Sequence, residues 1–119
     1  MGAVAAALRE RGCTVTGSDD NVYPPMSTFL ESRGVALNSG FRAENIPDDT
    51  DVVVIGNAMT RGNPEVEAVL NRKLYYLSLP EVLRNEFLRG RHNLVVSGTH
   101  GKTTTTALLT WIMKTAGFE

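Results

Sequence analysis

The stretch Ser97–Thr106, SGTHGKTTTT, decides the fold of the chain's C-terminal part, because it has the pattern of a phosphate-binding loop. Gly98 and Gly101 let the backbone approach an anion closely and take positive φ. Lys102 would reach the β- and γ-phosphates as a point charge, and the hydroxyl of Thr103 would bind Mg²⁺. The sequence therefore predicts a site for a nucleoside triphosphate, and we expect ATP.

The residues around this loop place it between a strand and a helix. The general pattern G-x-x-x-x-G-K-[ST] would have its first glycine where this chain has Val96, so the match is incomplete. Asn93–Val96 is nevertheless predicted to be a buried strand, and Lys102–Thr115 a helix whose free N–H groups attract anions. A strand–turn–helix connection that contains Gly-Lys-Thr by chance is the alternative. The remaining cofactor-binding candidates are Thr99, His100 and Thr104, with His100 ordering the loop rather than acting as a general base.

The composition describes an ordinary soluble domain without a polyanionic partner. The chain has 119 residues, 42% hydrophobic and 21% charged, with a formal net charge of −1, so nothing favours nucleic acid or an anionic membrane. Its apolar run Met1–Leu8 precedes basic residues, the reverse of a secretory signal. The one cysteine, Cys13, excludes an internal disulfide and is expected to be a small core residue. We expect a cytoplasmic location.

Helix and strand patterns alternate along the chain. This rhythm predicts an α/β fold, a mostly parallel sheet with helices on both faces. Capping-box spacing marks Thr28 with Glu31 and Ser78 with Glu81, while Asn63-Pro64 predicts a capped helix start. The predicted helices are Ala3–Arg11, Thr28–Arg33, Pro64–Arg72 and Pro80–Leu88, and the predicted strands are Cys13–Gly17, Val35–Leu37, Asp51–Ile55 and Tyr75–Leu77.

Polar residues follow two of these strands. Ligands of open parallel sheets bind at the carboxyl ends of the strands, and an acidic residue there can bond ribose hydroxyls. Ordinary turn chemistry is the alternative at each position. The substrate-binding candidates are Ser18 and Asp19, just past the first strand, and Asn57 and Ala58 after the third, with Tyr23 and Arg61 as secondary candidates.

Three separated motifs carry a resemblance to the Mur ligase family, which builds peptidoglycan precursors. Ser97–Thr106 resembles the ATP loop of that family. Gly17–Thr28, GSDDNVYPPMST, and Ile55–Glu65, IGNAMTRGNPE, resemble its murein peptide ligase branch. The branch that adds L-alanine is a competing match, but it usually has serines where this chain has Gly56 and Asn57. The motifs occur in the family's order and cover nearly the whole chain.

The resemblance implies a domain organisation. Residues 1–90 would be a Rossmann-like UDP-sugar-binding domain that lacks its first strand and most of its glycine-rich loop. Residues 91–119 would be the opening strand, phosphate loop and helix of the central ATP-binding domain. The chain is thus expected to be a fragment that is inactive alone.

The resemblance also implies a reaction. ATP and Mg²⁺ would serve an amide ligase that joins the tripeptide L-Ala-γ-D-Glu-meso-diaminopimelate to UDP-N-acetylmuramate through an acyl phosphate, in peptidoglycan recycling. Lys102 and Thr103 would be its catalytic residues here, with Thr103 on the metal. The alternatives are an L-alanine ligase acting on the same sugar nucleotide and a nucleotide-binding module without catalysis. An NAD(P)-dependent oxidoreductase is a further alternative, although the chain has no G-x-G-x-x-G loop.

Overall fold

The computed structural model describes residues 1–118, and the chain divides into two compact units, Met1–Arg89 and Gly90–Glu119. This division lies next to the predicted boundary, and the functions assigned to the two parts stay predictions. Within residues 1–118, every helix falls short of the length and apolar character that crossing a bilayer requires.

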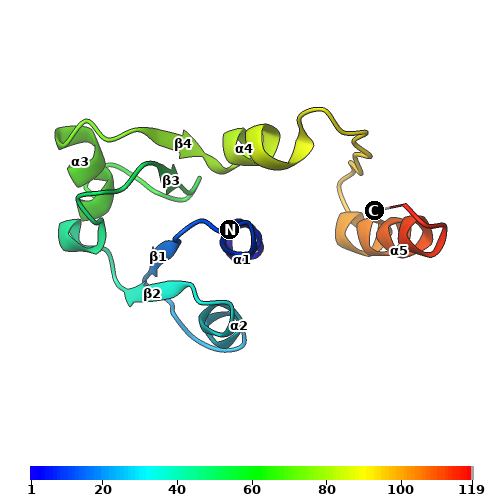
Figure 1. Ribbon diagram of the computed structural model, residues 1–119, viewed down its shortest axis with the longest axis horizontal. Coiled ribbons are helices and arrows are strands. Elements are labelled where there is room, and N and C mark those ends of the chain that lie inside the picture. The colour runs from blue at the N-terminus through cyan, green and yellow to red at the C-terminus, as the bar shows by residue number, and fades with distance from the viewer. Residues whose placement is uncertain (119) are drawn as a thin grey trace. The chain divides into compact units, whose positions relative to one another are not determined.

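The first half of unit 1 is a parallel strand pair covered by two helices (Figure 1). Strands β1 and β2 pair in parallel, with Thr16 opposite Ala36 and Asp19 opposite Ser39. Helices α1 and α2 lie side by side against this pair, and their apolar residues form its core together with Val35, which directly precedes β2. The elements are α1 (Gly2–Glu10), β1 (Thr16–Asp19), α2 (Met26–Ser32) and β2 (Ala36–Ser39), and the core residues are Ala6, Leu30 and Val35.

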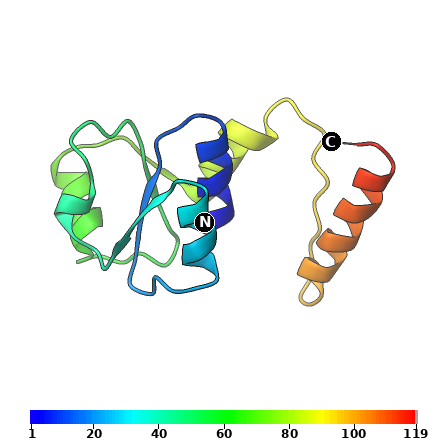
Figure 2. The same cartoon turned by 60° about the horizontal axis from the view of Figure 1, so that its bottom comes forward.

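The second half of unit 1, coloured from teal to yellow in Figure 2, repeats the parallel pairing between the two strands that Figure 1 labels β3 and β4. Strands β3 and β4 pair with Val53 opposite Tyr76 and Ile55 opposite Ser78. Val69 of α3 is the most completely buried large side chain among the described residues. The elements are the 3₁₀ turn η1 (Ala43–Asn45), β3 (Val53–Ile55), α3 (Pro64–Asn71), β4 (Tyr76–Ser78), α4 (Leu79–Val82) and the π-helix η2 (Leu83–Leu88), while unit 2 contains α5 (Lys102–Thr115).

The predicted α/β class with parallel strands is confirmed, with one difference in continuity. The described strands form two separate two-stranded sheets, β1–β2 and β3–β4. β1 and β3 therefore each have one edge without a strand partner within residues 1–118. Unpaired edge groups must find water or other partners, so these edges add less to stability than a continuous sheet would.

The prediction for the first strand is wrong at its start. β1 begins at Thr16, and Cys13 is exposed rather than in the core. The reason is that Cys13 completes the end of α1: its N–H donates to Leu8 O at 3.2 Å, and its carbonyl accepts from Arg9 Nη1 at 3.2 Å. The β-branched residues of this segment therefore form a strand only beyond the hydrogen bonds that end the helix.

The helix-start predictions have mixed outcomes. Asn63 caps α3, with its Oδ1 accepting the N–H groups of Glu65 at 3.0 Å and Val66 at 3.2 Å. The Thr28 capping box is wrong, because α2 already begins at Met26. At the start of α4, the Glu81 carboxylate accepts from both the N–H and the hydroxyl of Ser78, each at 2.7 Å.

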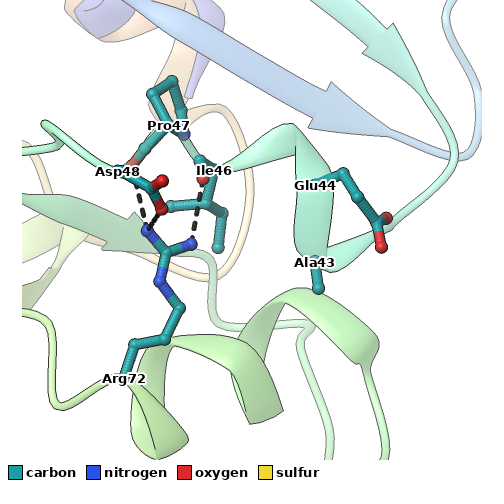
Figure 3. Close-up of a pocket in the computed structure, with 6 residues that line it drawn as sticks. All are labelled: Ala43, Glu44, Ile46, Pro47, Asp48 and Arg72. Atoms are coloured by element: carbon teal, nitrogen blue, oxygen red, sulfur yellow. Dashed lines mark hydrogen bonds and ion pairs between the residues drawn. The ribbon is translucent and has the colours of Figure 1, made fainter.

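A single arginine fixes the segment that follows η1 (Figure 3). Arg72, at the C-terminal end of α3, donates to Ile46 O at 2.9 Å and Pro47 O at 3.2 Å, and pairs with Asp48 at 2.9 Å. These contacts lie in an open hollow of about 400 Å³, from which Glu44 points away. The hydrogen bonds of the guanidinium to the chain's own carbonyls hold this segment in place.

Glu81→Gln tests the capping contact at α4. The N–H and then the hydroxyl of Ser78 lower the pKa of the Glu81 carboxyl below its ordinary value. A carboxyl whose pKa is depressed by folding stabilises the fold above its unfolded pKa, and that stabilisation is lost as pH falls below about 4. We expect Glu81→Gln to lower Tm at pH 7 and the difference to be smaller at about pH 3, because the stabilisation is lost as pH falls through the lowered pKa of the folded state. Glu31→Gln, on the exposed side of α2, controls for the lost charge; equal Tm differences at both pH values would contradict the contact.

Arg72→Ala tests which of its contacts matter. Removing the donors to two carbonyls is expected to lower the free energy of unfolding by about 1–3 kcal/mol. Asp48→Ala is expected to cost below about 1 kcal/mol, because the Asp48 side chain is fully exposed. Urea unfolding followed by circular dichroism measures both. Equal losses for the two variants would mean that the ion pair, and not the carbonyl contacts, holds the segment.

Candidate functional site

In unit 2, two glycines in left-handed conformations shape the predicted phosphate loop. Gly98 has φ +151° and Gly101 has φ +74°, values that side-chain-bearing residues rarely adopt. Gly101 is the N-cap residue of α5, and its carbonyl accepts from Thr105 N–H at 3.0 Å. No side chain caps this helix end within the described residues. The first N–H groups of α5 are therefore open to an anion.

Lys102 folds back across the loop. Its Nζ donates to Gly98 O at 2.7 Å and to Thr99 O at 3.2 Å. The ammonium group thus lies at the loop, within the turn that the glycines make, rather than extended into solvent. Thr103 and Thr104 are exposed in the first helical turn, and His100 is exposed in the loop.

The predicted strand before the loop is wrong. Asn93–Val96 forms no strand, and Leu94 and Val95 are 58% and 85% exposed. Strand structure requires backbone hydrogen bonds to a neighbour, and unit 2 provides no other strand among the described residues. Strand propensity is present here without a sheet to join.

The apolar stripe of α5 is likewise unburied. Leu108, Trp111 and Ile112 are 56%, 66% and 48% exposed, so within the described residues they form no core in unit 2. The cause is the same, because unit 2 contains a single helix and no second layer within the described residues.

In unit 1, the structure places Ser18 and Asp19 inside β1, as its last two residues, rather than past its end. Consecutive strand residues point to opposite faces of the sheet. Ser18 is half-buried and Asp19 is exposed. Asp19 Oδ1 accepts the N–H of Asn21 at 2.9 Å, and its carbonyl accepts the N–H of Gly40 at 2.9 Å. Asp19 thus turns the chain at the strand's end, while Ser18 faces the interior.

An open hollow of about 500 Å³ lies where the strands of unit 1 end. Asp20 follows β1, Phe41 follows β2 and Ala58 follows β3, so three strands contribute to it. Of the predicted residues it includes Ala58 and Arg61, whereas Asn57 and Tyr23 are exposed outside it. Its remaining lining is the Met59–Pro64 segment.

A part-buried hydrogen-bond network lies beside this edge. Asn45 Nδ2 donates to Glu65 Oε1 at 2.7 Å, to Gly40 O at 3.0 Å and to Ser18 Oγ at 3.3 Å. Glu65 Oε1 also accepts the N–H of Arg42 at 3.3 Å. Carbonyl and carboxylate oxygens only accept, so these contacts fix which end of the Asn45 amide faces them.

Sequence reasoning missed Asn45, Phe41 and Asp20, and it used Glu65 only as part of a motif. Asn45 and Phe41 belong to no recognisable motif, and Asn45 meets Ser18 across 27 residues of chain. The polar run Ser18–Asn21 was a local signal for Asp20, but nothing local showed that it faces the segment after β3. Within residues 1–118, no three or more His, Cys, Asp and Glu side chains are grouped to hold a metal ion.

Comparison with known proteins adds independent findings. A sequence model described as "Mur ligase family, catalytic domain" matches residues 1–91. The chain is 52% identical over all of its 119 residues to the UDP-N-acetylmuramate–L-alanyl-γ-D-glutamyl-meso-2,6-diaminoheptandioate ligase of Escherichia coli K12, covering 26% of that protein. It is 40% identical to the UDP-N-acetylmuramate–L-alanine ligase of a Psychrobacter species, covering 24% of that protein.

A solved structure agrees with the sequence comparison. The crystal structure of a murein peptide ligase from Psychrobacter arcticus superimposes with a TM-score of 0.93 at 49% identity, over 98% of this chain and 24% of that one. The chain thus spans about a quarter of the length of the relatives it matches.

Proposed function

This chain belongs to the Mur ligase family, and from that premise we propose that it serves an ATP-dependent ligase that joins a peptide amine to UDP-N-acetylmuramate. The printed names of the relatives supply the substrates, and the higher identity to the tripeptide ligase than to the L-alanine ligase favours the tripeptide L-Ala-γ-D-Glu-meso-diaminopimelate. The reaction belongs to peptidoglycan recycling, and we place it in the cytoplasm, where ATP and UDP-sugars are found.

We assign different substrates to the two units. Residues 1–90 would hold the UDP-sugar, with Ser18, Asp19, Asn57 and Ala58 as candidate contacts at the carboxyl ends of the strands. Residues 91–119 would hold the phosphates of ATP. What supports this division is that each part carries one kind of ligand-binding geometry: a parallel-strand edge in unit 1 and a glycine loop before a helix in unit 2.

The observation that carries the ATP assignment is the position of Lys102. Its ammonium group bonds two carbonyl oxygens of its own loop, and uncapped N–H groups of α5 lie next to that loop. A phosphate would offer the ammonium charged oxygens in place of neutral ones, which makes stronger hydrogen bonds. As the γ-phosphoryl group moves to the lactyl carboxylate, Lys102 and the loop N–H groups would offset the charge that develops.

The donor set also fits a magnesium ion. Thr103 is exposed in the first turn of α5, and Mg²⁺ in phosphate sites prefers oxygen ligands such as its hydroxyl together with phosphate oxygens. When bound, the ion would supply positive charge to the phosphate groups. Gly98, Thr99, His100, Gly101 and Thr104 would complete the cradle for the nucleotide.

Titration of the chain with three nucleotides tests the substrate classes. We expect calorimetric heats with UDP-N-acetylmuramate and with ATP in the presence of Mg²⁺, and none with NAD. UDP-N-acetylmuramate is expected to bind without ATP, because its candidate contacts belong to unit 1. Binding of NAD with no response to the other two would contradict the ligase assignment.

Lys102→Ala tests the phosphate loop in catalysis. The suitable protein is the Escherichia coli ligase with its matching quarter replaced by this chain, since the two are 52% identical over that length. Loss of the ammonium is expected to lower kcat by several orders of magnitude, about 10³-fold, because charge stabilisation in the transition state is lost. Phosphate release measures the rate.

Lys114→Ala is the matched control for that experiment. Lys114 lies in the last turn of the same helix, at the end opposite to the loop. The Lys114→Ala substitution removes the same charge, and we expect its kcat to stay within about twofold of that of the unsubstituted chimera. Normal turnover by the Lys102→Ala chimera would refute the role of the loop.

A further inference from the structure

The Ser18 hydroxyl is held by a side chain that can only donate to it. Ser18 Oγ accepts from Asn45 Nδ2 at 3.3 Å, and the amide nitrogen has no lone pair with which to accept in return. The hydroxyl hydrogen must therefore point elsewhere. Within residues 1–118 no acceptor for it is found, although Ser18 is half-buried.

The orientation of the Asn45 amide is itself fixed by stronger contacts. Its nitrogen lies 2.7 Å from Glu65 Oε1 and 3.0 Å from Gly40 O, and both oxygens can only accept. An amide that turned its oxygen toward Glu65 would face a carboxylate with like partial charge. Glu65 is a part-buried carboxylate in the first turn of α3, where the helix N-terminus favours negative charge.

Glu65 is anchored from several directions. Its N–H donates to Asn63 Oδ1 at 3.0 Å, and its Oε1 accepts the N–H of Arg42 at 3.3 Å. Charge therefore sets the direction of these hydrogen bonds. The Glu65 carboxylate accepts from the Asn45 amide, the same amide donates to the Ser18 oxygen, and the hydrogen of the Ser18 hydroxyl remains available. Hydrogen bonds to charged groups are the stronger ones, so the carboxylate governs the polarity of the whole network.

We propose that Asn45 and Glu65 are positioning residues that fix Ser18 as a hydrogen-bond donor to an acceptor oxygen of the sugar nucleotide, phosphoryl or carbonyl. The inference rests on the proposed function, because it takes the carboxyl edge of β1 as the UDP-sugar site. It adds two residues and a direction of donation to that site. A hydroxyl held in this way keeps its hydrogen available to an oxygen that accepts.

Reversing the polarity of the network tests the proposal. In Asn45→Asp with Glu65→Gln, the amide and the carboxylate exchange places, so the two side chains can still bond each other and the net charge is unchanged, while Gly40 O and the Arg42 N–H lose these partners. The Ser18 hydroxyl would then face a carboxylate and turn its hydrogen inward. We expect Tm closer to wild type than in either single variant, with affinity for UDP-N-acetylmuramate about tenfold weaker, as in Ser18→Ala. Recovery of affinity together with Tm would overturn the proposal, because a purely structural pair would restore both.

A double-mutant cycle covers the case in which the exchanged pair does not fold. Asn45→Ala is expected to weaken binding of UDP-N-acetylmuramate in the Ser18 protein and to have no further effect in the Ser18→Ala protein. Additive losses would overturn the proposal. Asp48→Asn is the control: like Glu65→Gln it changes an acid to an amide, but it lies in the same loop as Asn45 and away from Ser18. We expect it to leave the affinity for UDP-N-acetylmuramate unchanged. A loss of affinity equal to that of Asn45→Ala would mean that general loosening of the loop explains the effect.

Binding of UDP is compared with binding of UDP-N-acetylmuramate, to show which part of the ligand supplies the acceptor oxygen. The same measurements distinguish failure of this inference from failure of the proposed function. If Ser18→Ala weakens UDP and UDP-N-acetylmuramate alike, the oxygen belongs to the nucleotide; if it weakens only the latter, the oxygen belongs to the sugar. Binding by the unmodified chain that Ser18→Ala leaves unchanged would overturn this inference alone. Failure of the unmodified, folded chain to bind either probe would overturn the proposed function with it.

Discussion

Parallel pairing of the strands is the constraint on which the rest of unit 1 depends. Because β1 runs parallel to β2 and β3 runs parallel to β4, each connection must cross over before the chain can return, and helices or turns fill the crossovers. The carboxyl ends of three of these strands then meet at one hollow, lined by Asp20, Phe41 and Ala58. Residues that are distant in sequence become neighbours through the topology alone, which is the general reason why open parallel folds bind ligands at this edge.

Helix α3 stabilises the segment between β2 and β3. At its start, Glu65 bonds Asn45 and the backbone of Arg42; at its end, Arg72 bonds the carbonyls of Ile46 and Pro47. A segment without regular structure is thereby fixed at both ends by charge-assisted hydrogen bonds from one rigid element. The same helix therefore stabilises the fold and orients a side chain beside the candidate ligand edge.

Local signals were readable from the sequence, and long-range ones were not. The Asn63 cap could be predicted because its partners are two and three residues away in the chain. The contact of Asn45 with Ser18 spans 27 residues and carries no pattern. Two errors share a further cause: Cys13 was placed in a strand and Val95 in a sheet on local residue patterns. β-propensity does not show whether the backbone groups of a segment are already hydrogen-bonded at a helix end, or whether the neighbouring strand they need is missing. The glycine-containing loop before the helix was predicted from the sequence, whereas the hydrogen bond of the Lys102 ammonium group to a carbonyl oxygen of that loop was not.

The alternation of Ser18 and Asp19 across β1 makes the length of the preceding turn as important as its composition. The strand has period two, so one residue inserted or deleted between Gly12 and Thr16 would exchange the sheet faces on which the hydroxyl and the carboxylate lie, without changing either side chain. A buried carboxylate would then confront Glu65 across the Asn45 amide. The number of residues in this turn therefore determines which side chain faces Asn45.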